Sequence, residues 1–128
     1  MAECFLVFFE KRKDKFMKIR DIASVIDATV LSGEELLDTE VLSAYGCDLM
    51  SDVLAFVEDQ CMLLTGLINP QVIRTAEMVD MKAIVFVRGK EPTEEILELA
   101  REAGIAILAT KLPMYISCGK LYEAGIKQ

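Results

Sequence analysis

The chain contains no histidine, the side chain that most often acts as a general base near neutral pH. Catalytic mechanisms of the Ser-His-Asp or Cys-His kind are therefore excluded. The chain also has no Cys-x-x-Cys pair, because its four cysteines are far apart in the sequence, at Cys4, Cys47, Cys61 and Cys118. A zinc site would need all four thiolates to converge from distant segments. We interpret the cysteines instead as free, mostly buried thiols in a reducing cytoplasm.

Three sequence motifs that bind phosphates or carry a nucleophile are also missing. The chain has no Gly-x-x-x-x-Gly-Lys-Ser/Thr loop, no Gly-x-Gly-x-x-Gly turn and no Gly-x-Ser-x-Gly elbow. These absences argue against a kinase, a dehydrogenase and a hydrolase. We therefore predict no catalytic residues, no cofactor and no enzymatic activity. A small enzyme that uses Asp48, Asp52 or Lys111 is the remaining alternative.

Long apolar runs and an excess of basic residues are lacking as well. No stretch approaches the roughly 20 apolar residues of a membrane-spanning helix. The apolar run 4–9 is too short for a secretory signal, and its positive charges follow it instead of preceding it. Lysine and arginine number 14 against 21 aspartate and glutamate residues, a formal net charge of −7, which disfavours nucleic acid and anionic membranes. We expect a soluble, cytoplasmic protein that binds neither.

Across its 128 residues, of which 53% are hydrophobic, the chain alternates short apolar runs with segments whose apolar residues recur at helical spacing. Buried strands and amphipathic helices joined by short loops favour parallel pairing, with helices on both faces of the sheet. The expected strands are residues 28–31, 41–45, 61–65, 83–87 and 105–109. The expected helices cover residues 19–26, a segment that ends at 57, 70–79, 92–103 and part of the segment after 113. This pattern predicts an α/β fold, a three-layer α/β/α sandwich with a mostly parallel sheet of about five strands.

Residues 1–16 differ in composition from the rest, with an apolar run followed by the basic segment 11–15. We interpret them as an N-terminal extension and residues 17–128 as the domain. One hypothesis is that Met17 is the natural start. The rival hypothesis is that residues 5–9 form an added edge strand or cover a subunit face, which suits the homodimer that we expect. The mass of the natively expressed protein distinguishes these two starts.

A binding site is expected beyond the carboxyl ends of the strands, where ligands bind in open parallel sheets. There, Arg88, Lys90 and Lys111 can hold a phosphate or carboxylate together with the helix starts near residues 70 and 92. The alternative is that these are ordinary loops with solvated charges. The candidate ligand-binding residues are Asp48, Ser51, Asp52, Thr65, Gly66, Asn69, Arg88, Gly89, Lys90, Thr110 and Lys111.

Asp48, Ser51 and Asp52 form the densest polar group among these candidates. Their spacing places them close together at the start of a helix. Oxygen ligands of this kind suit Mg²⁺ or a ligand hydroxyl. The alternative is that Asp48 or Ser51 caps the helix and that the acids interact favourably with its dipole. We predict no resident metal.

Several short motifs resemble the DRTGG domain family, and within it a group of stand-alone single-domain proteins. The matching segments are 46–53 (GCDLMSDV), 64–66 (LTG), 89–92 (GKEP), 107–110 (ILAT) and 119–126 (GKLYEAGI). The chain departs from the Asp-Arg-Thr-Gly-Gly pattern of the family, because the charged Asp-Arg part is missing beside Thr65-Gly66. The resemblance therefore implies no ligand role for such a pair in this chain.

The resemblance also implies a fold similar to the N-terminal domain of HPr kinase/phosphorylase and a regulatory role. The family occurs in phosphotransacetylases and beside CBS domains, and no catalytic role is attached to it. The first functional hypothesis is a non-enzymatic regulatory or ligand-sensing domain that binds a nucleotide or another small anionic metabolite. The second is a protein-interaction adaptor for a partner enzyme, without a small-molecule ligand.

Overall fold

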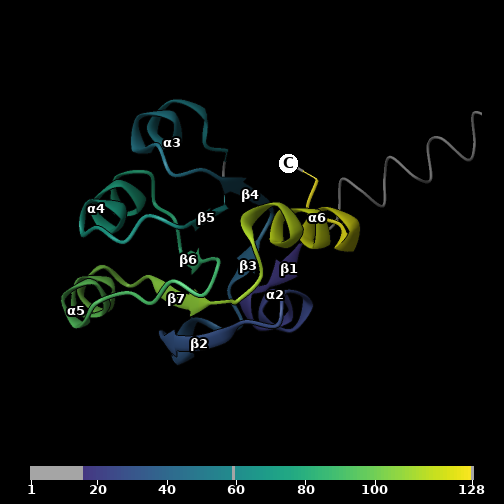
Figure 1. The fold of residues 1–128 in the computed structure, drawn as a ribbon, viewed down its shortest axis with the longest axis horizontal. Helices are drawn as coiled ribbons and strands as arrows, with labels where there is room; N and C mark the ends of the chain where they lie inside the picture. Colours follow the sequence, from purple (N-terminus) through teal and green to yellow (C-terminus); the bar gives the residue numbers. More distant parts are fainter. Residues whose placement is uncertain (1–15, 59, 128) are drawn as a thin grey trace, which may run out of the picture.

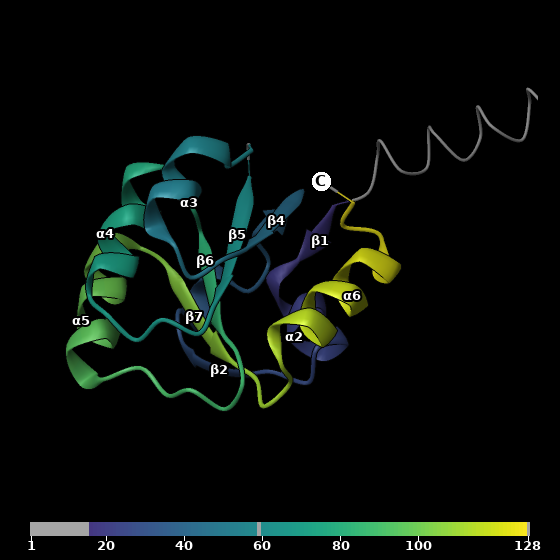
Figure 2. The same ribbon diagram turned by 45° about the horizontal axis from the view of Figure 1, so that its top comes forward.

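The computed structural model describes residues 16–58 and 60–127, which form a five-stranded sheet and a small two-stranded sheet (Figures 1 and 2). The strands are β1 (Met17–Lys18), β2 (Thr29–Ser32), β3 (Glu40–Val41), β4 (Ser43–Gly46), β5 (Cys61–Thr65), β6 (Ala83–Phe86) and β7 (Ala106–Ala109). The helices are α2 (Ile19–Val25), α3 (Met50–Phe56), α4 (Gln71–Met78), α5 (Glu94–Ala103) and α6 (Met114–Ala124), with a 3₁₀ turn, η1, at Glu34–Leu36.

The large sheet has the order β2-β7-β6-β5-β4. The four strands from β4 to β7 are parallel, and β2 lies antiparallel to β7 at the edge. The mostly parallel sheet of about five strands is therefore confirmed. Its central strands are apolar throughout because both of their faces are covered, and every residue of β5 and β6 is buried.

Helices cover both faces of this sheet, which confirms the three-layer sandwich (Figure 1). On one face, α3, α4 and α5 contribute Val53, Ile73 and Ile96 to a single apolar core. On the other face, α2 and α6 contribute Ile22 and Leu121 to a second core. The helices that follow β4, β5 and β6 thus share one face, whereas α6, which follows β7, lies on the opposite face.

The predicted strand 41–45 is divided in the structure between two sheets. β3 pairs with β1 in antiparallel register, with Met17 opposite Val41, whereas β4 joins the large sheet beside β5. A strand of two residues such as β1 has no periodicity that a sequence pattern can show. The hypotheses about residues 1–15, including an edge strand at 5–9, lie outside the described residues.

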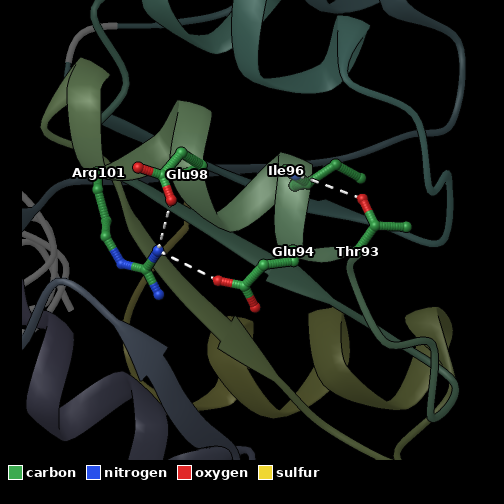
Figure 3. Close-up of polar contacts among 5 residues, drawn as sticks. All are labelled: Thr93, Glu94, Ile96, Glu98 and Arg101. Carbon is green, nitrogen blue, oxygen red and sulfur yellow. Dashed lines mark hydrogen bonds and ion pairs between the residues drawn. The ribbon is translucent and has the colours of Figure 1, made fainter.

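Both ends of α5 are capped, and the helix begins two residues later than the expected range 92–103. The Thr93 hydroxyl accepts a hydrogen bond from the Ile96 amide at 3.3 Å (Figure 3), and Gly104 ends the helix in the left-handed region with φ of 71°. Along the exposed side, Arg101 contacts Glu94 at 3.5 Å and Glu98 at 3.4 Å.

The predicted cap of α3 is wrong. Leu49 is the N-cap residue, and its apolar side chain forms no capping hydrogen bond. The Asp48 carboxylate forms its hydrogen bonds with another segment of the chain. By contrast, the Asn69 side chain accepts a hydrogen bond from the Gln71 amide at 2.8 Å, at the start of α4.

Three cysteines lie in the described part of the chain, and all three are free thiols. Cys61 is buried in β5, and burial is the main cause that raises its pKa. Burial also raises the pKa of Cys118, which packs from α6 against Gly46. Within the same residues, no helix is both long and apolar enough to cross a membrane.

Candidate functional site

The carboxyl ends of β6 and β7 lie side by side, and the chain leaves them towards opposite faces of the sheet (Figure 1). The loop after β6 leads to α5 on one face, and the loop after β7 leads to α6 on the other. Neighbouring strands whose connections diverge in this way leave a crevice beyond their carboxyl ends, and ligands of open α/β sheets bind there. The topology therefore favours this end of the sheet as a binding site.

A tight turn at residues 87–90 shapes the loop after β6. Arg88 and Gly89 have positive φ values of 61° and 70°, and the Lys90 amide donates a hydrogen bond to the Val87 carbonyl at 3.2 Å. Two successive left-handed residues closed by this hydrogen bond form a type I′ turn. Glycine adopts such a φ freely, whereas arginine does so at a cost in free energy.

The two loops are tied together by their backbones. The Gly89 amide donates to the Thr110 carbonyl at 3.0 Å, and the Arg88 amide donates to the Leu112 carbonyl at 2.9 Å. The Thr110 hydroxyl is buried and donates to the carbonyl of Ile26 at 2.7 Å, which fastens the end of α2 to the same place. Thr110 thus acts as an anchor of the loops and has no free hydroxyl proton for a ligand.

A cleft of about 680 Å³ opens beside these loops. This volume suits a small organic ligand. The segment before and within β2, the loop after β6, the first part of α5 and the end of β7 all contribute to its lining. The lining residues are Asp27, Thr29, Leu31, Gly89, Lys90, Glu91, Pro92, Leu97, Ala109, Thr110, Lys111 and Leu112.

Charge in the cleft is mixed. Lys90 and Lys111 are both exposed, and within the described residues neither forms an ion pair. Asp27 and Glu91 also line the cleft and are likewise unpaired within that part of the chain. Lysine side chains at a loop rim are free to turn towards a phosphate or carboxylate. The two carboxylates can accept hydrogen bonds from ligand hydroxyls or amines.

A second polar group lies further along the rim, at the ends of β4 and β5. Asp48 Oδ1 accepts a hydrogen bond from the buried Thr65 hydroxyl at 2.9 Å and another from the Gly66 amide at 2.8 Å. The Thr65 hydroxyl in turn accepts one from the Leu67 amide at 3.1 Å. The Arg88 guanidinium lies across Gly66, since a Cβ placed on that glycine would be 3.0 Å from Arg88 Nη2. Asp48 therefore joins the loop after β4 to the loop after β5.

The DRTGG domain model matches residues 21–121 of the chain. This match spans most of the chain and includes both polar groups on the rim. This chain belongs to the DRTGG domain family.

The fold of this DRTGG domain is also found in a solved structure. That structure contains the CBS and DRTGG domains of the regulatory region of Clostridium perfringens pyrophosphatase, complexed with its activator diadenosine tetraphosphate. The two chains superpose with a TM-score of 0.69 at 13% sequence identity, and the match covers 85% of our chain and 48% of the other. Our chain thus spans about half the length of that structure, and the likeness concerns the fold alone. No curated protein matches the sequence.

An aspartate and an arginine flank Thr65-Gly66 in this DRTGG domain, although neither lies next to it in the sequence. Asp48 reaches it from the loop after β4, and Arg88 reaches it from the loop after β6. The family pattern places both charges directly before the threonine, where this chain has Leu63 and Leu64. Both leucines are fully buried in β5, so charged side chains would not suit those positions here.

Removal of the Asp48 carboxylate is expected to destabilise the DRTGG domain. The Asp48→Ala variant leaves the buried Thr65 hydroxyl and the Gly66 amide without their acceptor, and a lost acceptor of this kind typically costs about 1–3 kcal/mol. Urea unfolding should show this loss for Asp48→Ala, and a smaller one for Asp48→Asn, which keeps an acceptor oxygen. Equal stability of Asp48→Ala and wild type would show that these hydrogen bonds contribute nothing.

The remaining candidates do not line the cleft. Ser51 and Asp52 lie on α3, and the side chain of Asn69 is engaged at the start of α4. Partial burial raises the pKa of Tyr45, and negative charge at Cys47 and Asp52 raises it further. In the part of the chain that the structure describes, no group of three or more cysteine, aspartate or glutamate side chains is placed to hold a metal ion.

Eight of the eleven residues predicted from the sequence therefore fall into two groups. Gly89, Lys90, Thr110 and Lys111 come together at the cleft. Asp48, Thr65, Gly66 and Arg88 come together at the neighbouring rim. The cleft residues Asp27, Thr29 and Leu31 were not predicted, because the sequence does not show that β2 lies against β7. Leu97 was not predicted either, because it was interpreted only as part of the apolar face of a helix.

Proposed function

We propose that this DRTGG domain is a non-enzymatic ligand-sensing domain that binds a small anionic metabolite or nucleotide in the cleft beyond β6 and β7. The observation that carries the proposal is the pair of lysines, Lys90 and Lys111, which come from two different loops, line one cleft and form no ion pair with any described residue. Ammonium groups on opposite loops can contact the same phosphate or carboxylate.

The apolar part of the lining supports an organic ligand over an inorganic ion. Leu31 and Leu97 are partly buried against the core on the α5 face, and Ala109 lies at the end of β7. An apolar base with a few polar groups around it is the usual composition of small-molecule sites. A nucleotide fits this arrangement, because its base is apolar on both faces while its phosphate is anionic.

Dinucleoside polyphosphates are included in the proposed ligand class because of the related structure. The pyrophosphatase regulatory region, whose DRTGG domain shares this fold, was solved with diadenosine tetraphosphate as its activator. A regulatory role towards a partner enzyme, and a homodimeric state, are part of the same proposal.

A thermal-shift screen with adenine mononucleotides, dinucleoside polyphosphates and small phosphorylated metabolites tests the proposal. A ligand at about a hundred times its dissociation constant adds roughly 2.7 kcal/mol to the free energy of unfolding. For a domain of this size the midpoint of unfolding should rise by several degrees. A panel without any shift would contradict the proposal and favour an adaptor that binds only a partner protein.

A further inference from the structure

Helix α6 exposes more apolar surface than its place in a three-layer sandwich requires. Ser117 and Leu121 face the interior and are buried. On the outer side, Tyr115 is 86% exposed, Tyr122 is 56% exposed and Ile116 is 43% exposed. A helix that is apolar on both of its faces is usually covered on both.

The exposed residues of α6 form one stripe with a glycine at its centre. Tyr115, Ile116, Gly119, Tyr122 and Glu123 recur at spacings of three and four, so they lie on the same side of the helix. They line a shallow hollow of about 590 Å³ together with Cys118 and Lys120. We name this stripe the α6 face.

The glycine in this stripe is not required by the fold of a single chain. A Cβ built on Gly119 has nothing within 4 Å, and Gly119 lies within the helix without a positive φ. Glycine in the middle of a helix is less favourable than alanine. Gly119 does, however, leave room for another molecule to approach the helix closely, and we explain its presence in this way.

We propose that the α6 face binds the α6 face of a second copy of this chain, with the two helices antiparallel about a two-fold axis at Gly119. In that arrangement residues at equal distances on either side of Gly119 face each other. Ile116 of one copy then faces Tyr122 of the other, and Tyr115 faces Glu123. The contact is self-complementary, as a two-fold interface must be.

Electrostatics favours the α6 face over the exposed apolar side chains of α3 as the contact between two copies. Two copies of a chain with a formal net charge of −7 repel each other over most of their surfaces. The α6 face is an exception, because Lys120 offsets Glu123, and Lys127 lies 4.9 Å from the centre of the Tyr122 ring.

Among the described residues, the other exposed large apolar side chains are Phe16, Leu49, Leu54, Phe56 and Met78. Leu54 and Phe56 lie on α3, just after Leu49, whereas Phe16 and Met78 belong to separate segments. Asp52 and Glu58 lie beside the α3 side chains without a basic residue in the same segment. Two copies that met through α3 would therefore bring like charges together, which is unfavourable. The inference does not depend on the ligand cleft, since no residue of the α6 face lines that cleft.

Light scattering on the full chain at tens of micromolar, with the variants Gly119→Arg and Phe56→Arg, tests the proposal. The wild type is expected to show the mass of two chains and Gly119→Arg the mass of one. Gly119→Arg should keep the circular dichroism spectrum of the wild type, because an outward side chain at this position meets no other atom. Phe56→Arg, a matched exposed position on α3, should keep the mass of two chains.

Three results would overturn the proposal. They are a wild type with the mass of one chain, a folded Gly119→Arg variant with the mass of two chains, and a Phe56→Arg variant with the mass of one chain. The first would leave the α6 face to a different partner, and the third would move the interface to α3.

Discussion

Replacement of both Lys90 and Lys111 by alanine is expected to weaken the binding of an anionic ligand by roughly 100-fold. Each ammonium group contributes a charge-assisted contact, and for exposed lysines we take about 1.4 kcal/mol each, which is tenfold in the dissociation constant. Each single variant should therefore lose about tenfold. Isothermal titration calorimetry, with the strongest ligand from the thermal-shift screen, measures these constants directly.

Lys82→Ala is the matched control for the two lysine variants. Lys82 lies just before β6, at the opposite end of that strand from Lys90, and pairs with Asp80 at 3.1 Å on the surface. Removal of its charge changes the net charge as each single variant does but leaves the cleft intact. Similar losses of affinity in Lys82→Ala and Lys90→Ala would show that the ligand responds to net charge and not to the cleft.

Arg88→Ala distinguishes the cleft from the neighbouring rim. The Arg88 side chain lies over Gly66 and does not line the cleft, so we expect a smaller loss of affinity than for Lys90→Ala. A larger loss would place the anion between the loops after β5 and β6.

Replacement of Gly33 by alanine is expected to be among the most destabilising single changes in the chain. Gly33 follows β2 with φ of 84°, and a Cβ there would be 2.7 Å from the Cα of Ala106 in β7. A left-handed alanine costs about 1–2 kcal/mol, and overpacking against buried backbone adds about 1–3 kcal/mol. Urea unfolding should show a loss of about 3 kcal/mol.

Gly104→Ala separates the two contributions to that loss. Gly104 has φ of 71°, close to that of Gly33, but a Cβ there meets nothing within 4 Å. It should therefore lose only the backbone contribution, about 1 kcal/mol. Equal losses in the two variants would contradict the close approach of the turn after β2 to β7, on which one wall of the cleft depends.

The central strands could be predicted from the sequence because their burial on both faces is a local property. Residues 61–65 form β5 as predicted. β6 ends one residue earlier than its expected range, and β7 begins one residue later than its expected range. The position of β2 beside β7 could not be predicted, since a strand's own residues do not specify its neighbour. The cleft depends on that pairing, because one side of its lining consists of Asp27, Thr29 and Leu31.

The rim of β6 and β7 was predicted because loops after parallel strands meet at one end of a sheet. The role of Asp48 was not. Its position suggested either a helix cap or a ligand contact, whereas its carboxylate binds Thr65, 17 residues further along the chain. Such a hydrogen bond depends on the distance between two loops, and that distance is set by the packing of the whole sheet.

The central claim is that a small anionic ligand binds in the cleft beyond β6 and β7. Amide chemical-shift mapping by NMR, with the strongest ligand from the thermal-shift screen, tests it most directly. The account predicts shifts at Gly89, Lys90, Thr110 and Lys111, and at Thr29 and Leu31 across the cleft, with α6 unchanged. Shifts confined to the loops around Asp48 and Thr65, or to α6, would contradict it.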